Sequence, residues 1–312
     1  MTAISRATRR RPGPRTRARW LTIALFVLPA LVLYAIFVLL PIVQAMQYSL
    51  YKWNGLTPLT DFVGLENYVT AVNSRSFTIS VGNNLLILCL SLFIQIPFSL
   101  ALAVLLNRRF PGRAMFRVLF FLPYVLSEAV TGIVFSLLLQ PDSVLDSTLA
   151  NAGLEGFVQD WLGDSTLVMI TLFVIITWKY FGFHMIIMLA GLQGIPRELE
   201  EAAYIDGADR RTAFRYVTLP LLGPTIRVSI FLSMIGALQL FDLVWVMTGG
   251  GPVNASSTMA IAMFKAGFRS HEFGYGSALA VILFLFCLVV ALLYQRFVLR
   301  RDTEGAVTAY GG

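Results

Sequence analysis

The chain has 312 residues, of which 57% are hydrophobic and 13% carry a charge, and its mean hydropathy is +0.74. This composition leaves too little polar surface for a water-soluble domain of this length, so the chain must place apolar surface against lipid. The net charge of +7 comes from arginines grouped by loop, with no basic face interleaved with aromatic residues, which excludes a nucleic-acid-binding module.

The N-terminal region combines a basic arm with an apolar run. Residues 1–19 are rich in arginine and contain Pro12 and Pro14, which predicts a disordered cytoplasmic arm. The apolar run 21–40 is longer than the roughly 7–15 residues of a secretory signal core, which is the alternative interpretation. We therefore predict an uncleaved first membrane helix over residues 21–46.

Five further apolar runs are long enough to cross a bilayer core, which takes roughly 20 residues. They cover 84–106, 116–139, 166–192, 226–247 and 277–299. Pro97 and Pro123 interrupt the second and third spans. Such breaks are tolerated where neighbouring helices or water satisfy the freed backbone groups, so the prolines indicate a helical bundle around a cavity.

Arginines concentrate in alternate loops. The arginine-rich segments are the N-terminal arm, 107–117, 193–227 and the C-terminal end, and the arginine-poor ones are 51–82, 140–165 and 248–276. Because positive loops stay in the cytoplasm, this alternation predicts six spans with both termini cytoplasmic. No loop is long enough to bury a core of its own, so we predict one transmembrane domain over 20–300 and a cytoplasmic tail over 301–312.

Motifs for catalysis and metal binding are missing from the sequence. Gly249-Gly250-Gly251 is followed by Pro252 and lacks the lysine of a phosphate-binding loop. The two histidines and two cysteines do not have metal-ligand spacing, so we expect no metal site, no disulfide framework and no cofactor. No G-x-S-x-G elbow occurs, although spacing alone does not test for a Ser/His pair formed in space, which leaves a membrane-embedded enzyme as an alternative.

Several polar residues lie inside or beside the predicted spans, where a charge costs free energy unless it is paired or faces water. They are Asn84, Gln95, Glu128, Lys179, His184, Gln239 and Asp242. One interpretation is an internal ion pair that holds helices together, such as Lys179 with Asp242 or Glu128. The other is a wet cavity between the third, fourth and fifth spans, where aromatic residues such as Tyr124 and Trp178 would pack on a sugar.

The loop 194–224, between the fourth and fifth spans, is polar and helix-forming. Pro196 suits a first helical turn, and the acidic residues within 198–201 suit the positive end of a helix dipole. Asp206-Gly207 predicts a turn, because glycine tolerates the positive φ that ends a helix, and a second amphipathic helix is expected over 208–219. The loop is therefore a helix–turn–helix, which serves either as a solvated linker or as a docking element for a soluble partner.

The residues of this loop resemble a known motif. Glu201-Ala202-Ala203, Asp206-Gly207-Ala208, Phe214 and Leu219-Pro220 are similar to the EAA loop in permease subunits of binding-protein-dependent ABC importers. Other patches resemble the sugar-transporting branch, in particular its larger-partner subunits of the maltose, lactose and glycerol-3-phosphate type. These patches are 62–68, Leu122-Pro123-Tyr124, 248–252 and 274–278.

The resemblance implies an all-α membrane protein with six transmembrane helices in the type I ABC importer permease fold, placed in a bacterial cell membrane. The chain itself would not be an enzyme, because two separate ATP-binding cassette subunits would hydrolyse ATP. A second permease subunit would complete the pathway, and an extracytoplasmic solute-binding protein would deliver a carbohydrate. The first EAA helix would dock on the ATPase, with Glu201, Ala202, Ala203, Asp206 and Gly207 as coupling residues.

For the substrate pathway, Tyr124 and Trp178 match positions that contact sugar in maltose-type relatives, whereas neighbouring positions differ in type and leave the sugar open. The residues expected along the pathway are Tyr124, Glu128, Trp178, Lys179, Tyr180, Gln239 and Asp242. One alternative is an ABC importer of a phosphate ester such as glycerol-3-phosphate, which Lys179 would suit. Another is an ion-coupled secondary transporter, in which Glu128 and Asp242 would be the coupling groups.

Overall fold

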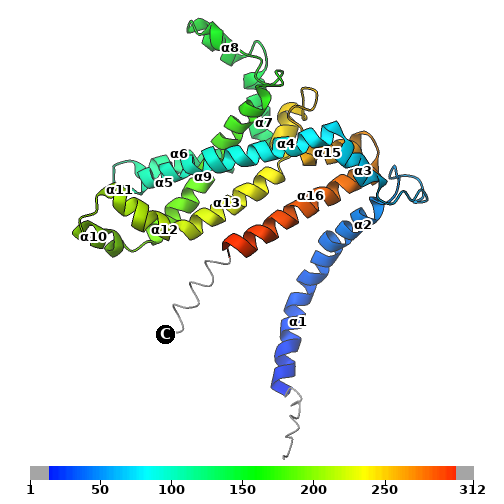
Figure 1. Ribbon diagram of the computed structural model, residues 1–312, viewed down its shortest axis with the longest axis horizontal. Helices are drawn as coiled ribbons and strands as arrows, with labels where there is room; N and C mark the ends of the chain where they lie inside the picture. The colour runs from blue at the N-terminus through cyan, green and yellow to red at the C-terminus, as the bar shows by residue number, and fades with distance from the viewer. Residues whose placement is uncertain (1–13, 300–312) are drawn as a thin grey trace, which may run out of the picture.

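The computed structural model describes residues 14–299 of the chain, and the regular structure in that part is helical apart from one isolated antiparallel bridge between Tyr51 and Phe62. The longest helices are α1 (Pro14–Tyr34), α4 (Arg75–Leu90), α9 (Val168–Gly194), α13 (Gly223–Leu238) and α16 (Phe273–Tyr294). All but α1 belong to one bundle (Figure 1). The predicted arm and tail lie largely outside the described residues, and α1 begins inside the segment predicted as disordered.

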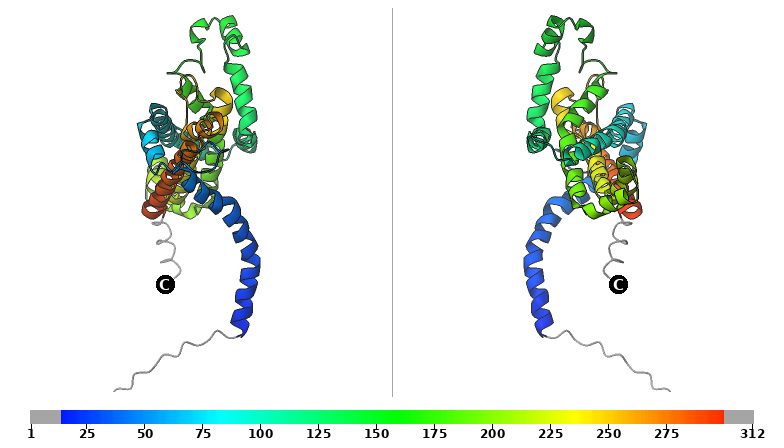
Figure 2. Two further views of the ribbon diagram at one scale, coloured as in Figure 1. Left: turned by 90° about the vertical axis from the view of Figure 1, so that its right-hand side faces the viewer. Right: turned by 90° about the vertical axis from the view of Figure 1, so that its left-hand side faces the viewer.

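The first helix stands apart from the bundle. A π-helical turn, η1 (Ala35–Leu39), joins α1 to α2 (Leu40–Tyr48), and the most apolar part of this unit has no buried residues. Figure 2 shows α1 curving away from the other helices, with only the α2 end touching them. Side chains such as Phe26 and Phe37 are 78% and 71% exposed, so this helix presents its apolar surface to lipid or to another subunit.

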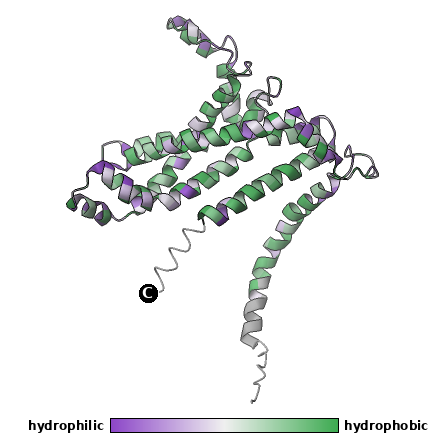
Figure 3. Ribbon diagram, viewed as in Figure 1, coloured by the Kyte–Doolittle hydropathy of each residue, from purple (hydrophilic) through white to green (hydrophobic). Residues whose placement is uncertain are grey.

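The second and fourth predicted spans are continuous helices that form the centre of the bundle. A π-helical turn, η2 (Ser91–Gln95), links α4 to α5 (Ile96–Asn107) in one continuous helix, so Pro97, which lies just after this turn, does not break the span, contrary to the prediction. The helix α9 packs against α5 on one side and α6 (Arg113–Val125) on another. Figure 3 shows hydrophobic residues along these long helices and polar residues at the bundle ends.

The third and fifth predicted spans, 116–139 and 226–247, are broken, and the break in the third lies three residues after Pro123, where the sequence predicts an interruption. The third consists of α6 and α7 (Glu128–Leu139), which are bent by 92° at Leu126-Ser127. In the fifth, α13 ends at Leu238, and the remaining residues form the short helix α14 (Asp242–Thr248). Four helices within 14–299 are long and apolar enough to cross a membrane alone, or up to six if each of two bent pairs is one span; these pairs are α6 with α7, and Arg210–Leu221 with α13, which are bent by 64°.

The remaining helices are short and flank the bundle. Outside the fourth loop they are α3 (Glu66–Asn73), α8 (Val144–Asn151), η3 (Glu155–Phe157), α15 (Met259–Phe264), η5 (Lys265–Arg269) and η6 (Gln295–Leu299), the last of which continues α16. In the fourth loop they are α10 (Arg197–Ile205), α11 (Arg210–Ala213), η4 (Phe214–Thr218) and α12 (Leu219–Leu221). Figure 1 shows α10–α12 and the α5–α6 connection at the same end of the bundle, so two arginine-rich loops lie together.

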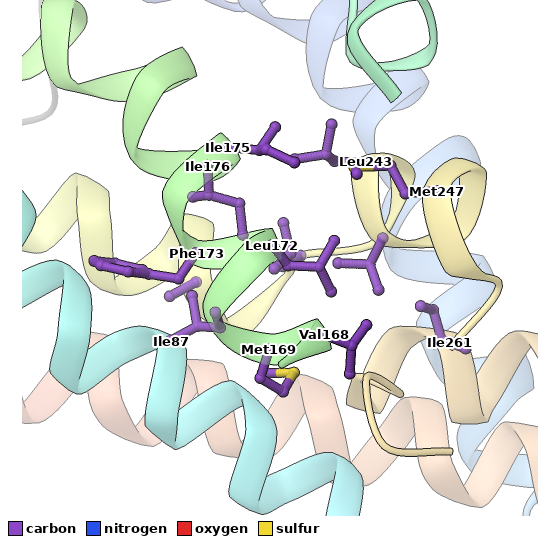
Figure 4. Close-up of a cluster of buried hydrophobic side chains, with 13 residues drawn as sticks. Ile87, Val168, Met169, Leu172, Phe173, Ile175, Ile176, Leu243, Met247 and Ile261 are labelled. Atoms are coloured by element: carbon purple, nitrogen blue, oxygen red, sulfur yellow. The ribbon is translucent and has the colours of Figure 1, made fainter. Parts of the chain in front are cut away.

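The largest cluster of buried apolar side chains joins α9 to α14 and α15. Figure 4 shows Leu172 and Ile175 of α9 facing Leu243 and Met247 of α14, with Ile261 of α15 beside them. Burial of this cluster holds the short helix α14 in place although it is no longer part of a continuous span. The core therefore lies next to the point where the fifth span is interrupted.

A buried asparagine explains why that interruption is tolerated. Asn84 of α4 is fully buried, and its Nδ2 donates to the carbonyl oxygens of Ala237 and Leu238 at 2.7 and 3.2 Å. Its Oδ1 accepts from the backbone N–H of Met259 at 2.8 Å. Carbonyl groups at a helix end inside a membrane need such partners, so Asn84, which the sequence marked as an intramembrane polar residue, stabilises the end of α13.

Candidate functional site

A cavity of about 320 Å³ lies where the two broken spans meet α4, η2 and α9. Its volume is at the lower end of the 300–1,000 Å³ typical of ligand pockets. Its polar lining residues are Ser91, Gln95, Tyr124, Glu128, Tyr180, His184, Ser233, Gln239 and Asp242. Five of the seven residues predicted along the substrate pathway therefore face one space, namely Tyr124, Glu128, Tyr180, Gln239 and Asp242.

The helix breaks place the acidic residues at this cavity. Glu128 is the first residue of α7, which begins after the 92° bend, and Asp242 is the first residue of α14, which begins after the break that ends α13. Ser127 starts α7 by accepting from the backbone N–H of Val130 at 3.2 Å. A continuous helix at either position would direct the carboxylate elsewhere, so the breaks create the site.

Tyrosines form one wall of the cavity. The Tyr180 hydroxyl donates to Glu128 Oε1, which joins α9 to the start of α7. Tyr124 lies edge-on to Tyr180, with ring centroids 5.9 Å apart, and stacks on Phe183 at 4.6 Å. Aromatic faces beside polar groups suit a sugar ring, because its C–H surface packs on the rings while its hydroxyl groups form hydrogen bonds.

Two buried polar residues of this lining, His184 and Gln95, differ in whether their side chains have a hydrogen-bond partner. His184 is 4% exposed, and its Nδ1 lies 2.7 Å from Ser229 Oγ, so one ring nitrogen is committed to α13. Gln95 is 2% exposed, and its side-chain amide has no hydrogen-bond partner within the described residues. An unpaired amide that faces a cavity is available to a ligand or water.

Trp178 and Lys179, which were predicted along the pathway, lie outside the cavity lining. Trp178 contacts Phe135 of α7 edge-on at 5.1 Å and is 37% exposed. Lys179 is 2% exposed, and its Nζ donates to the Leu126 carbonyl, which the α6–α7 break leaves free. Between residues 14 and 299 the expected ion pair of Lys179 with Glu128 or Asp242 is not formed, so Lys179 satisfies the broken backbone instead.

The fourth loop has the predicted helix–turn–helix geometry. The helix α10 ends at Ile205, and Gly207 follows with a φ of +87°, a conformation that favours glycine. The N–H of Ala208 donates to the Ala203 carbonyl at 2.9 Å and closes the turn. Asp209 then starts α11 by accepting from the N–H of Thr212, and hydrogen bonds from the Thr212 side chain and backbone lower the pKa of the Asp209 carboxyl.

The helix α10 presents both charged and apolar side chains outward. Glu201 and Ala202 are exposed, and Ala203 is half-buried. Leu199 and Ile205 are 44% and 87% exposed, which is unusual for apolar residues in a loop outside the apolar spans. This surface is not covered by any other part of the chain that the structure describes.

A contact that sequence reasoning missed ties α10 to the helix after the turn. The Thr218 hydroxyl donates to Glu200 Oε1 at 2.7 Å, and Thr218 is 4% exposed. The two residues are 18 positions apart, so helical spacing gave no signal for the pair. A charge-assisted hydrogen bond of this kind is stronger than one between neutral groups, so it stiffens the loop.

Comparison with known proteins decides the family. A family model described as binding-protein-dependent transport system inner membrane component matches residues 95–303. The chain belongs to this family. This inner membrane component is part of a transport system rather than an enzyme, which agrees with the missing catalytic motifs, and its apolar helices make it a multi-pass membrane protein.

Two relatives match most of the length of this chain. The lactose transport system permease protein LacF of Rhizobium radiobacter is 34% identical over 286 residues, covering 90% of this chain and 94% of LacF. The multiple sugar-binding transport system permease protein MsmF of Streptococcus mutans is 32% identical over 269 residues, covering 86% of this chain and 92% of MsmF. The recognition of a sugar-type ABC permease family from the EAA loop and the neighbouring patches is therefore confirmed.

A solved structure shows the same fold. A bacterial ABC transporter involved in the import of the acidic polysaccharide alginate contains a subunit that superposes on this chain with a TM-score of 0.80. The superposition covers 91% of this chain and 96% of the alginate transporter subunit. The sequence identity is 23%, so the likeness concerns the fold. The predicted all-helical permease fold is confirmed at this level, while the number of six crossings and the side of the termini stay predictions.

Proposed function

We propose that this chain is the membrane-spanning permease subunit of an ABC importer that carries a carbohydrate into the cytoplasm. The observation that carries the proposal is the cavity at the two helix breaks, where Tyr124 and Tyr180 lie beside unpaired hydrogen-bonding groups. LacF and MsmF, which are named for lactose and for multiple sugars, support the same class of solute. Lys179 is bound to a backbone carbonyl, which removes the group expected to favour a phosphate ester.

In this proposal the chain crosses the membrane six times and has both termini in the cytoplasm. The two arginine-rich loops at one end of the bundle support that orientation. A second permease subunit completes the pathway, two ATP-binding cassette subunits hydrolyse ATP, and an extracytoplasmic binding protein delivers the solute. Closure of the ATPase pair then rocks the helices between inward- and outward-facing states.

The coupling residues are Glu201, Ala202, Ala203, Asp206 and Gly207. Force on α10 reaches the cavity along a short covalent route, because η4 and α12 lead directly into α13, which lines the cavity with Ser233 and Gly236. The Glu200–Thr218 hydrogen bond joins α10 to the end of η4 across the turn. We infer that this bond makes α10 and η4 move as one body.

Replacing Thr218 with valine should therefore lower the number of solutes moved per ATP, because the isosteric side chain removes the hydrogen bond without changing the volume much. A hydrogen bond to a charged group contributes about 1.5–3 kcal/mol, which corresponds to a factor of about tenfold or more in a rate, and we expect uptake to fall by at least about tenfold while ATP hydrolysis is retained. The measurement is uptake and phosphate release in the same reconstituted complex. Thr218→Ser is the matched control and should behave as the wild type; equal loss in both variants would show that the hydroxyl is not responsible.

The proposed function is tested by reconstituting the complete complex in liposomes. A thermal-shift screen of the cognate binding protein against neutral sugars and glycerol-3-phosphate first selects the solute, and a labelled form then measures uptake. We expect ATP-dependent uptake of a sugar that persists after proton and sodium gradients are dissipated. Uptake that needs an ion gradient but no ATP would favour the secondary-transporter alternative, and uptake of glycerol-3-phosphate alone would favour the phosphate-ester alternative.

A further inference from the structure

The two acidic side chains that face the cavity, Glu128 and Asp242, give its lining a negative charge. The buried cation Lys179 directs its ammonium group to the Leu126 carbonyl and is not part of the lining; it interacts electrostatically with Glu128, so its single charge offsets one of the two carboxylates at most. His184 has one ring nitrogen 2.7 Å from Ser229 Oγ. The charge that a solute meets on this wall is therefore negative.

The helices α7 and α14, which carry the two carboxylates at their first residues, pack closely against each other. A Cβ atom on Gly132 would lie 2.8 Å from Val246 Cγ1, so the absence of a side chain at Gly132 lets the helices approach closely. Gly132 is four residues after Glu128, and Val246 is four residues after Asp242. This close contact fixes α7 and α14 relative to each other, and the first residues of both helices line the same cavity.

Helix dipoles do not reverse this charge. The beginnings of α7 and α14 carry partial positive charge, which in other proteins attracts anionic ligands. Here Glu128 and Asp242 themselves occupy the first position of each helix, so each dipole stabilises a carboxylate of the chain. An incoming anion would face those carboxylates first.

The cavity also has side chains that can form hydrogen bonds with an uncharged polar solute. Gln95 is 2% exposed and has no side-chain partner within residues 14–299, although burial of an unpaired amide costs free energy. It faces the same space as Tyr124 and Gln239. Amide groups donate to and accept from hydroxyl groups, so this lining matches a sugar ring.

We propose that this cavity accepts sugars without an acidic group, either neutral or carrying an amine, and that Glu128 and Asp242 exclude anionic sugars such as uronates and sugar phosphates. The proposal rests on the proposed function and specifies its class of solute. At separations of several ångströms, two carboxylates repel an anion and attract a cation strongly enough to change their relative local concentrations by about tenfold or more.

The charge of the cavity is tested without knowing the solute. A single cysteine is introduced at Gly236, which lines the cavity and has open space for a side chain, in a chain whose Cys89 and Cys287 are replaced by alanine. Its reaction rates with methanethiosulfonates that carry trimethylammonium or sulfonate are compared in the assembled complex. Relative to the rates with 2-mercaptoethanol, we expect the cationic reagent to be favoured by about tenfold at low salt, and less at high salt.

Neutralising both carboxylates with Glu128→Gln and Asp242→Asn should abolish that preference. The Tyr180 hydroxyl keeps its acceptor in this design, because the glutamine side chain retains a carbonyl oxygen. Glu155→Gln, which removes one charge from an exposed residue outside the cavity, is the matched control and should keep the preference. Ser233→Cys provides a second position in the lining. The proposal is overturned by equal rates for both reagents, by a preference that survives neutralisation, or by no reaction at either cysteine.

Inhibition of uptake separates this inference from the proposed function. Liposomes that hold the complete complex are loaded with ATP and an excess of cellobiose, the β-1,4-linked glucosamine disaccharide or cellobiuronic acid, so that each inhibitor reaches the cavity without meeting the binding protein outside. We expect the acid to inhibit uptake of the labelled solute at least about tenfold less well than the other two in the wild type, and about equally in the neutralised variant. A wild-type complex without any ATP-driven sugar uptake would refute the proposed function, whereas sugar uptake with equal inhibition by the acid would refute only the charge selection.

Discussion

Replacing Gly207 with aspartate should abolish ATP-driven uptake while the protein remains inserted in the membrane. Gly207 has a φ of +87°, a conformation that side chains rarely adopt, and it joins α10 to the segment that leads into η4. An aspartate there strains the turn and changes the angle at which α10 meets the ATPase. We expect ATP hydrolysis to continue without transport, measured as phosphate release and solute uptake by one reconstituted preparation.

Two further variants separate strain from docking. Gly156→Asp adds the same side chain at an exposed glycine with open space and no positive φ, and it should transport normally. Glu201→Lys reverses an exposed charge on α10 without straining the turn, and it should uncouple in the same way if Glu201 anchors the helix on its partner. Normal uptake together with normal ATPase co-purification in both Gly207→Asp and Glu201→Lys would refute the docking role of α10.

The geometry of this loop could be predicted because its determinants are local. The start of α10 follows from Pro196 and the acidic residues of the first turn, and its end follows from the conformational freedom of Gly207. Neighbours within a few residues decide such features. The structure has the helix, the turn and the second helix in the predicted order.

Pro123 predicted an interruption of the third span but not its 92° bend, and nothing in the apolar length predicted the break in the fifth span, because distant partners make both breaks tolerable. The end of α13 depends on Asn84, about 150 residues earlier in the chain, and the carbonyl freed before α7 depends on Lys179. For the same reason Lys179 was expected to pair with a carboxylate, and Trp178 was expected at the cavity rather than on Phe135. Sequence pattern identified which intramembrane residues are polar, but not which of them satisfy backbone and which face the cavity.

The relative position of α6 and α9 depends on a glycine. A Cβ atom on Gly182 of α9 would overlap the Phe120 carbonyl oxygen and lie 2.6 Å from its carbon. Both atoms belong to the backbone of α6, so no rotamer change can relieve the contact. The same two helices carry Tyr124 and Tyr180, whose ring centroids are 5.9 Å apart at the cavity. Any separation of α6 from α9 therefore alters the aromatic wall.

Replacing Gly182 with alanine should destabilise the protein by about 3 kcal/mol or more, because the methyl group forces two packed backbones apart. This corresponds to a fall of about 5–10 °C in the temperature of unfolding, measured by fluorescence-detected size exclusion after heating in detergent. Gly194→Ala, at the end of the same helix, has open space for the methyl group and should leave that temperature unchanged. If the two variants unfold at the same temperature, the close approach of α6 at Gly182 does not exist in the folded protein. If Gly182→Ala is less stable and also takes up solute more slowly at a temperature where it remains folded, the spacing of α6 and α9 sets the shape of the cavity.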